Sequence, residues 1–219
     1  MKIGIFGGTF DPIHCGHLRS AEDVRETFAL DRLYFVPAAR PPHKNRADIA
    51  SAEHRFKMVE LAVADHPAFV ASAVELERPG LSYSIDTIRH FLATDQPATL
   101  ALMLGIDAFR DLPSWKESAS IPALCDLIVT TRPGEELPPA TAFLPVALQN
   151  AFWYDPAIRM YRHASGHFLT LHHIAGLSIA SSTLRHLMQH GRSLRYLVPA
   201  AVEAYITNHR LYKAEECQR

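Results

Sequence analysis

The stretch GGTFDPIHCGH, which begins at Gly7, gathers residue types that can hold an anion. Gly7 and Gly8 follow an apolar run typical of a buried strand, and glycines allow positive φ angles and close approach of a ligand to the backbone. His14 and His17 lie three apart, where a first helix is expected to begin and its unpaired N–H groups favour an anion. The pattern predicts a phosphate site, and a simple tight turn is the alternative explanation of the glycines.

A metal site is a second reading of the same stretch, because Asp11 and Cys15 lie close to the two histidines in sequence. Structural zinc sites usually pair two separated ligand motifs, and no second C-x-x-C or H-x-x-H element follows. The P-loop motif G-x-x-x-x-G-K-[ST] and the dinucleotide motif G-x-G-x-x-G are also missing. The sequence therefore disfavours a zinc protein, a P-loop ATPase and an ordinary dehydrogenase.

Two further clusters carry chemistry. The loop RPPHKNR holds His43 and Lys44, and a compact lysine charge suits a phosphate, although a solvated basic loop is equally compatible. In SIASSTLR, a predicted helix begins near Ser181 and Ser182, with Arg185 one turn on. This makes a second anion site, with ordinary serine capping as the alternative.

These residues need a scaffold of alternating strands and helices. Expected strands cover 2–6, 33–36, 69–76, 99–104, 127–131 and 168–171, and expected helices cover 17–28, 52–64, 85–92, 182–190 and 200–208. Ser51 and Ser84 are expected to cap the second and third helices, and Gly191 to follow the fourth. The alternation predicts an α/β, Rossmann-like doubly wound parallel sheet with flanking helices. We expect one domain over 1–219, with a helical C-terminal part at about 177–213, and 149–167 stays unassigned.

Composition narrows the function classes. The 219 residues carry a net charge of −1, which argues against a nucleic-acid partner. Three widely spaced cysteines do not form a disulfide framework and indicate a reducing compartment. Strand-like sequence from residue 2 leaves no room for a signal peptide, and no apolar run reaches the length of a membrane span. We expect a cytoplasmic protein without a membrane partner, either a monomer or a small homo-oligomer.

The stretch GGTFDPIHCGH resembles the G-x-F-D-P-x-H-x-G-H signature of the nucleotidylyltransferase superfamily. Within it the chain is similar to the nicotinate mononucleotide adenylyltransferases of bacteria. Further blocks carry the resemblance in the same order along most of the chain: VPAARPPHK, RPGLSYSIDT, LGIDAFRDLPSWK, TRPG, IASSTLR and YLVPAAVEAYITNHRLY.

The resemblance implies adenylyl transfer from ATP to nicotinate mononucleotide, with Mg²⁺ on the ATP phosphates and no metal ligand from the protein. It implies catalytic roles for His14, His17, Lys44 and Arg185. The implied ATP contacts are Gly7, Gly8, Thr9, Phe10, Gly105, Asp107, Arg132, Ser181 and Ser182, with Asp107 on the ribose and Arg132 beside the adenine. The chain departs from the family pattern at Ala180 and Ser182, which puts one hydroxyl contact to phosphate in question.

For the second substrate, the resemblance implies a pocket of His43, Lys44, Ser84, Ile85, Trp115 and Lys116. The nicotinate carboxylate would meet the backbone N–H groups of Ile85 and Lys116, and its ring would stack on Trp115. Backbone donors at a helix start favour a carboxylate over a carboxamide. The alternatives are preference for nicotinamide mononucleotide, a sister transferase acting on phosphopantetheine, a nucleotide-sensing module without turnover, and a metal-dependent protein.

Overall fold

A computed structural model describes residues 1–41, 49–131, 144–174 and 176–212. Its centre is an eight-stranded sheet in the order β3-β2-β1-β4-β5-β8-β7-β6. The strands are β1 (Lys2–Gly8), β2 (Arg32–Pro37), β3 (Phe69–Ala71), β4 (Thr99–Gly105), β5 (Asp126–Thr130), β6 (Phe152–Asp155), β7 (Met160–His163) and β8 (Phe168–His172). The pairings from β3 to β8 are parallel, which confirms the predicted doubly wound core.

One strand prediction differs from the structure, and the region left unassigned contains two strands. The strand expected over 69–76 ends at Ala71, and Val74–Glu77 forms the short helix α3 instead. The unassigned region 149–167 contains the antiparallel hairpin β6–β7, which extends the sheet beyond β8. The hairpin exposes Trp153 and Tyr154 at the sheet edge, so its sequence lacks the apolar run of a buried strand.

The helices follow the predicted order. They are α1 (Cys15–Thr27), α2 (Ala52–Val63), α4 (Ser84–Thr94), α5 (Ile106–Asp111), α7 (Ser181–Gln189) and α8 (Ala200–Asn208), with short 3₁₀ helices η2 (Leu112–Ser114), η3 (Ser118–Ala123) and η4 (Val146–Ala151). Ser51 caps α2 as predicted, because its side chain accepts a hydrogen bond from the His54 N–H. Ser84 does not cap α4, because Tyr83 occupies the cap position and Ser84 is the first helical residue. Gly191 follows α7 with a φ of +65°, as a C-terminal glycine should.

Each face of the sheet carries its own apolar core, because alternate residues of a strand point to opposite faces. On one face Leu102 packs with Ile88 of α4 and Phe109 of α5. On the other face Met103 packs with side chains of α1, α2, α7 and α8, among them Met58. The carboxyl ends of the parallel strands therefore open between two helical layers, where such sheets bind ligands.

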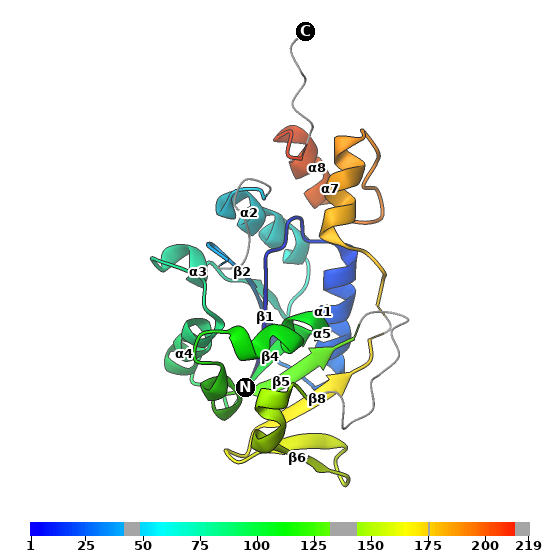
Figure 1. The fold of residues 1–219 in the computed structure, drawn as a ribbon. Helices are drawn as coiled ribbons and strands as arrows, with labels where there is room; N and C mark the ends of the chain where they lie inside the picture. Colours follow the sequence, from blue (N-terminus) through cyan, green and yellow to red (C-terminus); the bar gives the residue numbers. More distant parts are fainter. Residues whose placement is uncertain (42–48, 132–143, 175, 213–219) are drawn as a thin grey trace.

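Figure 1 shows the elements that surround this edge. The helices α7 and α8 lie at one end of the molecule, with α2, opposite the β6–β7 hairpin. The strand β1 runs up towards this end and leads through a loop into α1 (Figure 1). Among the described residues, no helix is both long enough and apolar enough to cross a bilayer.

Candidate active site

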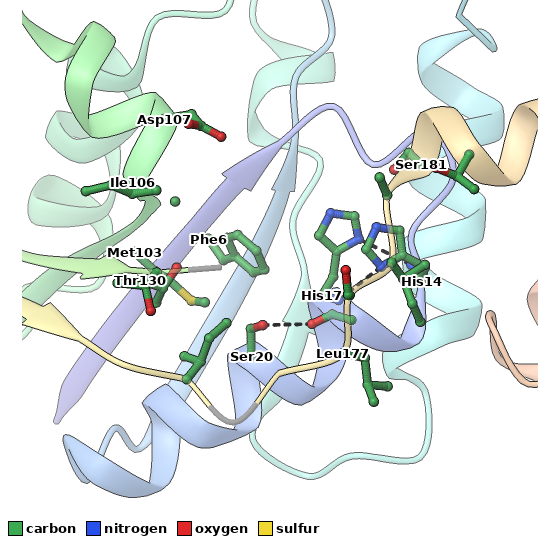
Figure 2. Close-up of a pocket in the computed structure, with 18 residues that line it drawn as sticks. Phe6, His14, His17, Ser20, Met103, Ile106, Asp107, Thr130, Leu177 and Ser181 are labelled. Carbon is green, nitrogen blue, oxygen red and sulfur yellow. Dashed lines mark hydrogen bonds between the residues drawn. The ribbon is translucent and has the colours of Figure 1, made fainter. Parts of the chain in front are cut away.

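His14 and His17 form a fixed pair at the start of α1. His14 is the N-cap residue and His17 lies one turn into the helix, so each side chain caps the other residue's backbone. The His17 N–H donates to His14 Nδ1 at 3.2 Å, and the His14 N–H donates to His17 Nδ1 at 3.3 Å. The two rings stack with their centroids 3.6 Å apart, and they face into a cavity (Figure 2).

This arrangement selects one tautomer for both rings. Because each Nδ1 accepts a hydrogen bond, the proton of each neutral imidazole lies on Nε2. Burial lowers the pKa of His14 to about 4, and burial together with the neighbouring His14 holds the pKa of His17 well below its usual value. At neutral pH the free protein therefore offers two neutral Nε2–H donors.

The lowered pKa of His14 predicts an acid-sensitive fold. The unfolded chain binds a proton on this histidine near pH 6.5, whereas the folded chain binds it only near pH 4. Between these values the unfolded state holds more protons, so stability is lost as the pH falls from 6.5 towards 4. From pH 7 to pH 5 this one residue should reduce the free energy of unfolding by about 2 kcal/mol. Urea unfolding at both pH values measures the loss.

His14→Asn is the matched control, because asparagine caps a helix and does not titrate. Between pH 7 and pH 5 its free energy of unfolding should fall by ~2 kcal/mol less than that of the wild type. Equal falls in the two proteins would contradict the assigned pKa of His14.

The cavity beside the two rings, here named the histidine cavity, has a volume of about 460 Å³. It lies between the start of α1, the ends of β4 and β5 and the segment that leads into α7 (Figure 2). Asp107 projects into it from the side opposite the histidines, and Ser181 borders it near His14 (Figure 2). Hydrogen-bond donors and a carboxylate thus face each other across a space of nucleotide size.

A second space, the central cavity of about 570 Å³, opens over the end of β1. Gly7, Gly8 and Thr9 line it, and an added Cβ at Gly7 would meet nothing within 4 Å. Gly105 borders both this cavity and the histidine cavity, so the two spaces meet at the end of β4. Two ligands bound in them would therefore approach each other beside the glycines and the histidine pair.

A third space, the tryptophan cavity of about 410 Å³, continues from the central cavity. Both are lined by Ser84 and Trp115, and the tryptophan cavity adds Ile85 and Lys116. The helix α4 begins here, and its first N–H groups have no earlier carbonyl in the helix to bond. Lys116 pairs with Asp86 through Nζ at 3.1 Å. Backbone N–H donors and the aromatic face of Trp115 thus lie together, an arrangement that suits a flat ring carrying a carboxylate.

Arg185 reaches the loop before α1 through Asp11. Its Nη1 donates to the Asp11 carbonyl oxygen at 2.8 Å and lies 3.4 Å from Asp11 Oδ2. The Tyr212 hydroxyl donates to Asp11 Oδ1 at 2.6 Å, and burial together with this carboxylate raises the pKa of Tyr212. The other N–H groups of Arg185 make no hydrogen bond with described residues, which leaves them for an anion.

Some predicted site residues lie apart from the cavities. The Phe10 side chain is buried against Phe6 and His17 and lines none of the three spaces. Positive φ occurs at Phe10 and not at Gly7 or Gly8, so that expectation for the glycines was wrong. Ser182 is exposed and lines none of the three spaces either, and Ala180 rather than a serine is the N-cap of α7. His43, Lys44 and Arg132 lie outside the described residues.

Sequence reasoning missed two buried charged residues. Arg55 stands on the apolar stripe of α2, with Met58 and Val59 at the next helical positions, and a cation in such a stripe is a usable signal. Glu75 had no such signal, because it lay inside a segment predicted to be a strand. Arg55 bonds Thr9 and Ala39 as well as the nearby Ala50, and Glu75 bonds Thr87 on another helix.

Known proteins similar to this chain identify its family. A family model described as cytidylyltransferase-like matches residues 5–187. A probable nicotinate-nucleotide adenylyltransferase of Geobacter sp. (strain M21) is 47% identical over 97% of this chain and 98% of its own length. The protein of the same name from Geobacter sulfurreducens is 48% identical with the same coverage. The chain belongs to the nicotinate-nucleotide adenylyltransferase family.

A solved structure agrees with the fold of this adenylyltransferase family member. The Plasmodium falciparum nicotinic acid mononucleotide adenylyltransferase complexed with NaAD superposes with a TM-score of 0.70. The match covers 96% of this chain and 97% of the Plasmodium chain, at 18% sequence identity. At that identity the likeness supports the Rossmann-like architecture, and the roles of individual residues depend on the geometry described above.

Proposed function

We propose that the protein transfers the adenylyl group of ATP to nicotinate mononucleotide, giving nicotinate adenine dinucleotide and pyrophosphate for NAD synthesis. The observation that carries this proposal is the meeting of the histidine and central cavities at Gly105, beside the donors of His14 and His17. ATP would occupy the histidine cavity with its ribose near Asp107 and its adenine near Arg132. The mononucleotide would occupy the central cavity, with its ring in the tryptophan cavity.

The reaction needs no general base. The nucleophile is a phosphate oxygen with a second pKa near ~6, so it is already mostly ionised at neutral pH. This oxygen attacks the α-phosphorus of ATP, and the bond from that phosphorus to the bridging oxygen breaks in line as pyrophosphate leaves. The protein's task is to hold two polyanions in this alignment and to stabilise the charge that develops.

His14 and His17 suit that task because their Nε2–H groups are already fixed by the mutual capping. We propose that they donate to the phosphates of ATP as charge develops. Arg185 would add fixed positive charge from the start of α7, and Lys44 would do so from the loop before α2. The glycines at the end of β1 let the phosphates approach the backbone, as the open space over Gly7 allows.

Mg²⁺ would enter with ATP and neutralise part of the phosphate charge. In the part of the chain that the structure describes, no group of three His, Cys, Asp or Glu side chains could hold a metal ion. We propose that the ATP phosphates and water supply the ligands of this ion.

Pyrophosphate release tests the substrate. With ATP and Mg²⁺, kcat/KM should be at least about tenfold higher for nicotinate mononucleotide than for nicotinamide mononucleotide, because charge-assisted hydrogen bonds to backbone N–H groups favour the carboxylate. Equal values would contradict the proposed roles of Ile85 and Lys116. No release with either nucleotide would exclude the proposed reaction, and phosphopantetheine would then test the sister transferases.

A further inference from the structure

Glu75 is a buried carboxylate with one oxygen committed and one oxygen unpaired. It lies on α3 and is 7% exposed. Its Oε1 accepts a hydrogen bond from the Thr87 hydroxyl at 2.7 Å, which ties α3 to α4. Its Oε2 is buried and has no hydrogen-bond partner among the described residues. An unpaired buried carboxylate oxygen is costly, so such an atom calls for a donor that arrives with a ligand.

The place of Glu75 points to the ligand. The residue lines the central cavity and lines neither the histidine cavity nor the tryptophan cavity. If the nicotinate ring lies by Trp115 and the phosphate lies by Gly8 and the histidines, the middle of the mononucleotide faces Glu75. That middle part is the ribose.

The chemistry of the substrate leads to the same group. Nicotinate mononucleotide carries a carboxylate and a phosphate that are both ionised at neutral pH, so neither of them donates a hydrogen bond there. Its ribose hydroxyl groups are therefore its hydrogen-bond donors. A carboxylate would repel the phosphate and the nicotinate carboxylate, and it would accept from a hydroxyl.

We propose that Glu75 Oε2 accepts a hydrogen bond from a ribose hydroxyl of nicotinate mononucleotide and selects ribonucleotides over deoxyribonucleotides. This inference rests on the proposed function, because it takes that nucleotide as the second substrate. Glu75 is then a specificity residue for the acceptor sugar, as Asp107 is proposed to be for the sugar of ATP. The hydrogen bond from Thr87 fixes the carboxyl group before the substrate arrives.

The test combines substrate and protein changes. Pyrophosphate release is measured with nicotinate mononucleotide and with its 2′-deoxy and 3′-deoxy analogues, in the wild type and in Glu75→Met. Methionine has a similar length but no acceptor of comparable strength, and Thr87 can still donate to the Tyr83 carbonyl oxygen, 3.5 Å away. Glu77→Gln, on the exposed side of the same helix, is the matched control.

In the wild type and in Glu77→Gln, removing one of the two hydroxyls should lower kcat/KM by about 10- to 100-fold, since a hydrogen bond to a charged group is lost. In Glu75→Met, kcat/KM for the ribonucleotide should fall to about the wild-type value for that deoxy analogue. The ribo-to-deoxy ratio should then be close to one. Glu75→Gln keeps the shape and an acceptor for Thr87, and its ratio should lie below that of the wild type.

Two results would overturn the inference while leaving the proposed function standing. One is an active wild type that uses all three nucleotides equally well. The other is a ribo-to-deoxy ratio that stays unchanged in both Glu75 variants, even if their melting temperatures fall, because that is the signature of a purely structural role. A wild type that releases no pyrophosphate with nicotinate mononucleotide would instead refute the proposed function itself, and the inference with it.

Discussion

His17→Ala should lower kcat by about a hundredfold, which corresponds to ~3 kcal/mol of lost transition-state stabilisation. The reason is that His17 holds an Nε2–H donor in place before the reaction, by accepting the His14 N–H at its own Nδ1. A donor that acts mainly on developing charge changes turnover more than substrate binding. The KM for ATP should therefore change only a few-fold. Steady-state pyrophosphate release at saturating and limiting ATP separates the two quantities.

Two further variants make this result specific. His17→Gln keeps a terminal N–H group and should recover part of the lost kcat. If His17 instead acted as a proton acceptor, glutamine would recover nothing, because an amide takes up no proton. His90→Ala removes an exposed histidine of α4 and should leave kcat unchanged. Near-normal kcat in a folded His17→Ala protein would refute the proposed role of His17.

The sequence predicted the parts of this site that depend on local order. The strand β1 leads into glycines and then into a helix that begins at the histidines. All of these residues lie in one short stretch of the sequence, so local patterns were enough to predict them. The mutual capping of His14 and His17 was not predicted, although both residues were singled out. The mutual capping requires His14 to be the N-cap residue, whereas the helix was expected to begin at His17 rather than at Cys15.

The elements that were missed depend on contacts between distant parts of the chain. The β6–β7 hairpin forms by extending the edge of an existing sheet. Its exposed aromatic residues, such as Trp153, therefore do not follow the alternation of apolar and polar positions by which a half-buried strand is predicted from sequence. Glu75 belongs to a segment with the composition of a strand, but β3 ends early and four residues form α3. The partner of Glu75, Thr87, is on another helix, and no local pattern announces that pairing.

Arg55 is the clearest case of such a distant contact. Its side chain is 1% exposed, and its guanidinium donates to three backbone carbonyl oxygens. The acceptors are Ala50 at 3.0 Å from Nε, Thr9 at 2.8 Å from Nη1 and Ala39 at 3.5 Å from Nη2. Arg55 thus joins the loop after β1 to both flanks of the segment that contains Lys44. Burial lowers the pKa of Arg55, and the nearby Asp11 opposes that shift.

Arg55→Met should reduce the free energy of unfolding by about 2–4 kcal/mol, since it removes three hydrogen bonds from a charged donor to part-buried carbonyl oxygens. Urea unfolding at pH 7 measures the change. Arg89→Met is the matched control, because Arg89 is half-exposed and pairs with Glu117 at the surface. Such pairs contribute up to about 1 kcal/mol, so that variant should remain close to the wild type.

Arg55→Lys separates the charge of Arg55 from its geometry. Lysine keeps a cation near Asp11, but its single ammonium group cannot reproduce a planar fork that reaches three carbonyl oxygens on different loops. We expect this variant to recover less than half of the stability lost in Arg55→Met. Full recovery would mean that charge alone matters, and the connection between the β1 loop and the flanks of the Lys44 segment would then need another cause. A loss below about 1 kcal/mol in Arg55→Met itself would contradict the assigned role, because a hydrogen bond from a charged group typically contributes more than that.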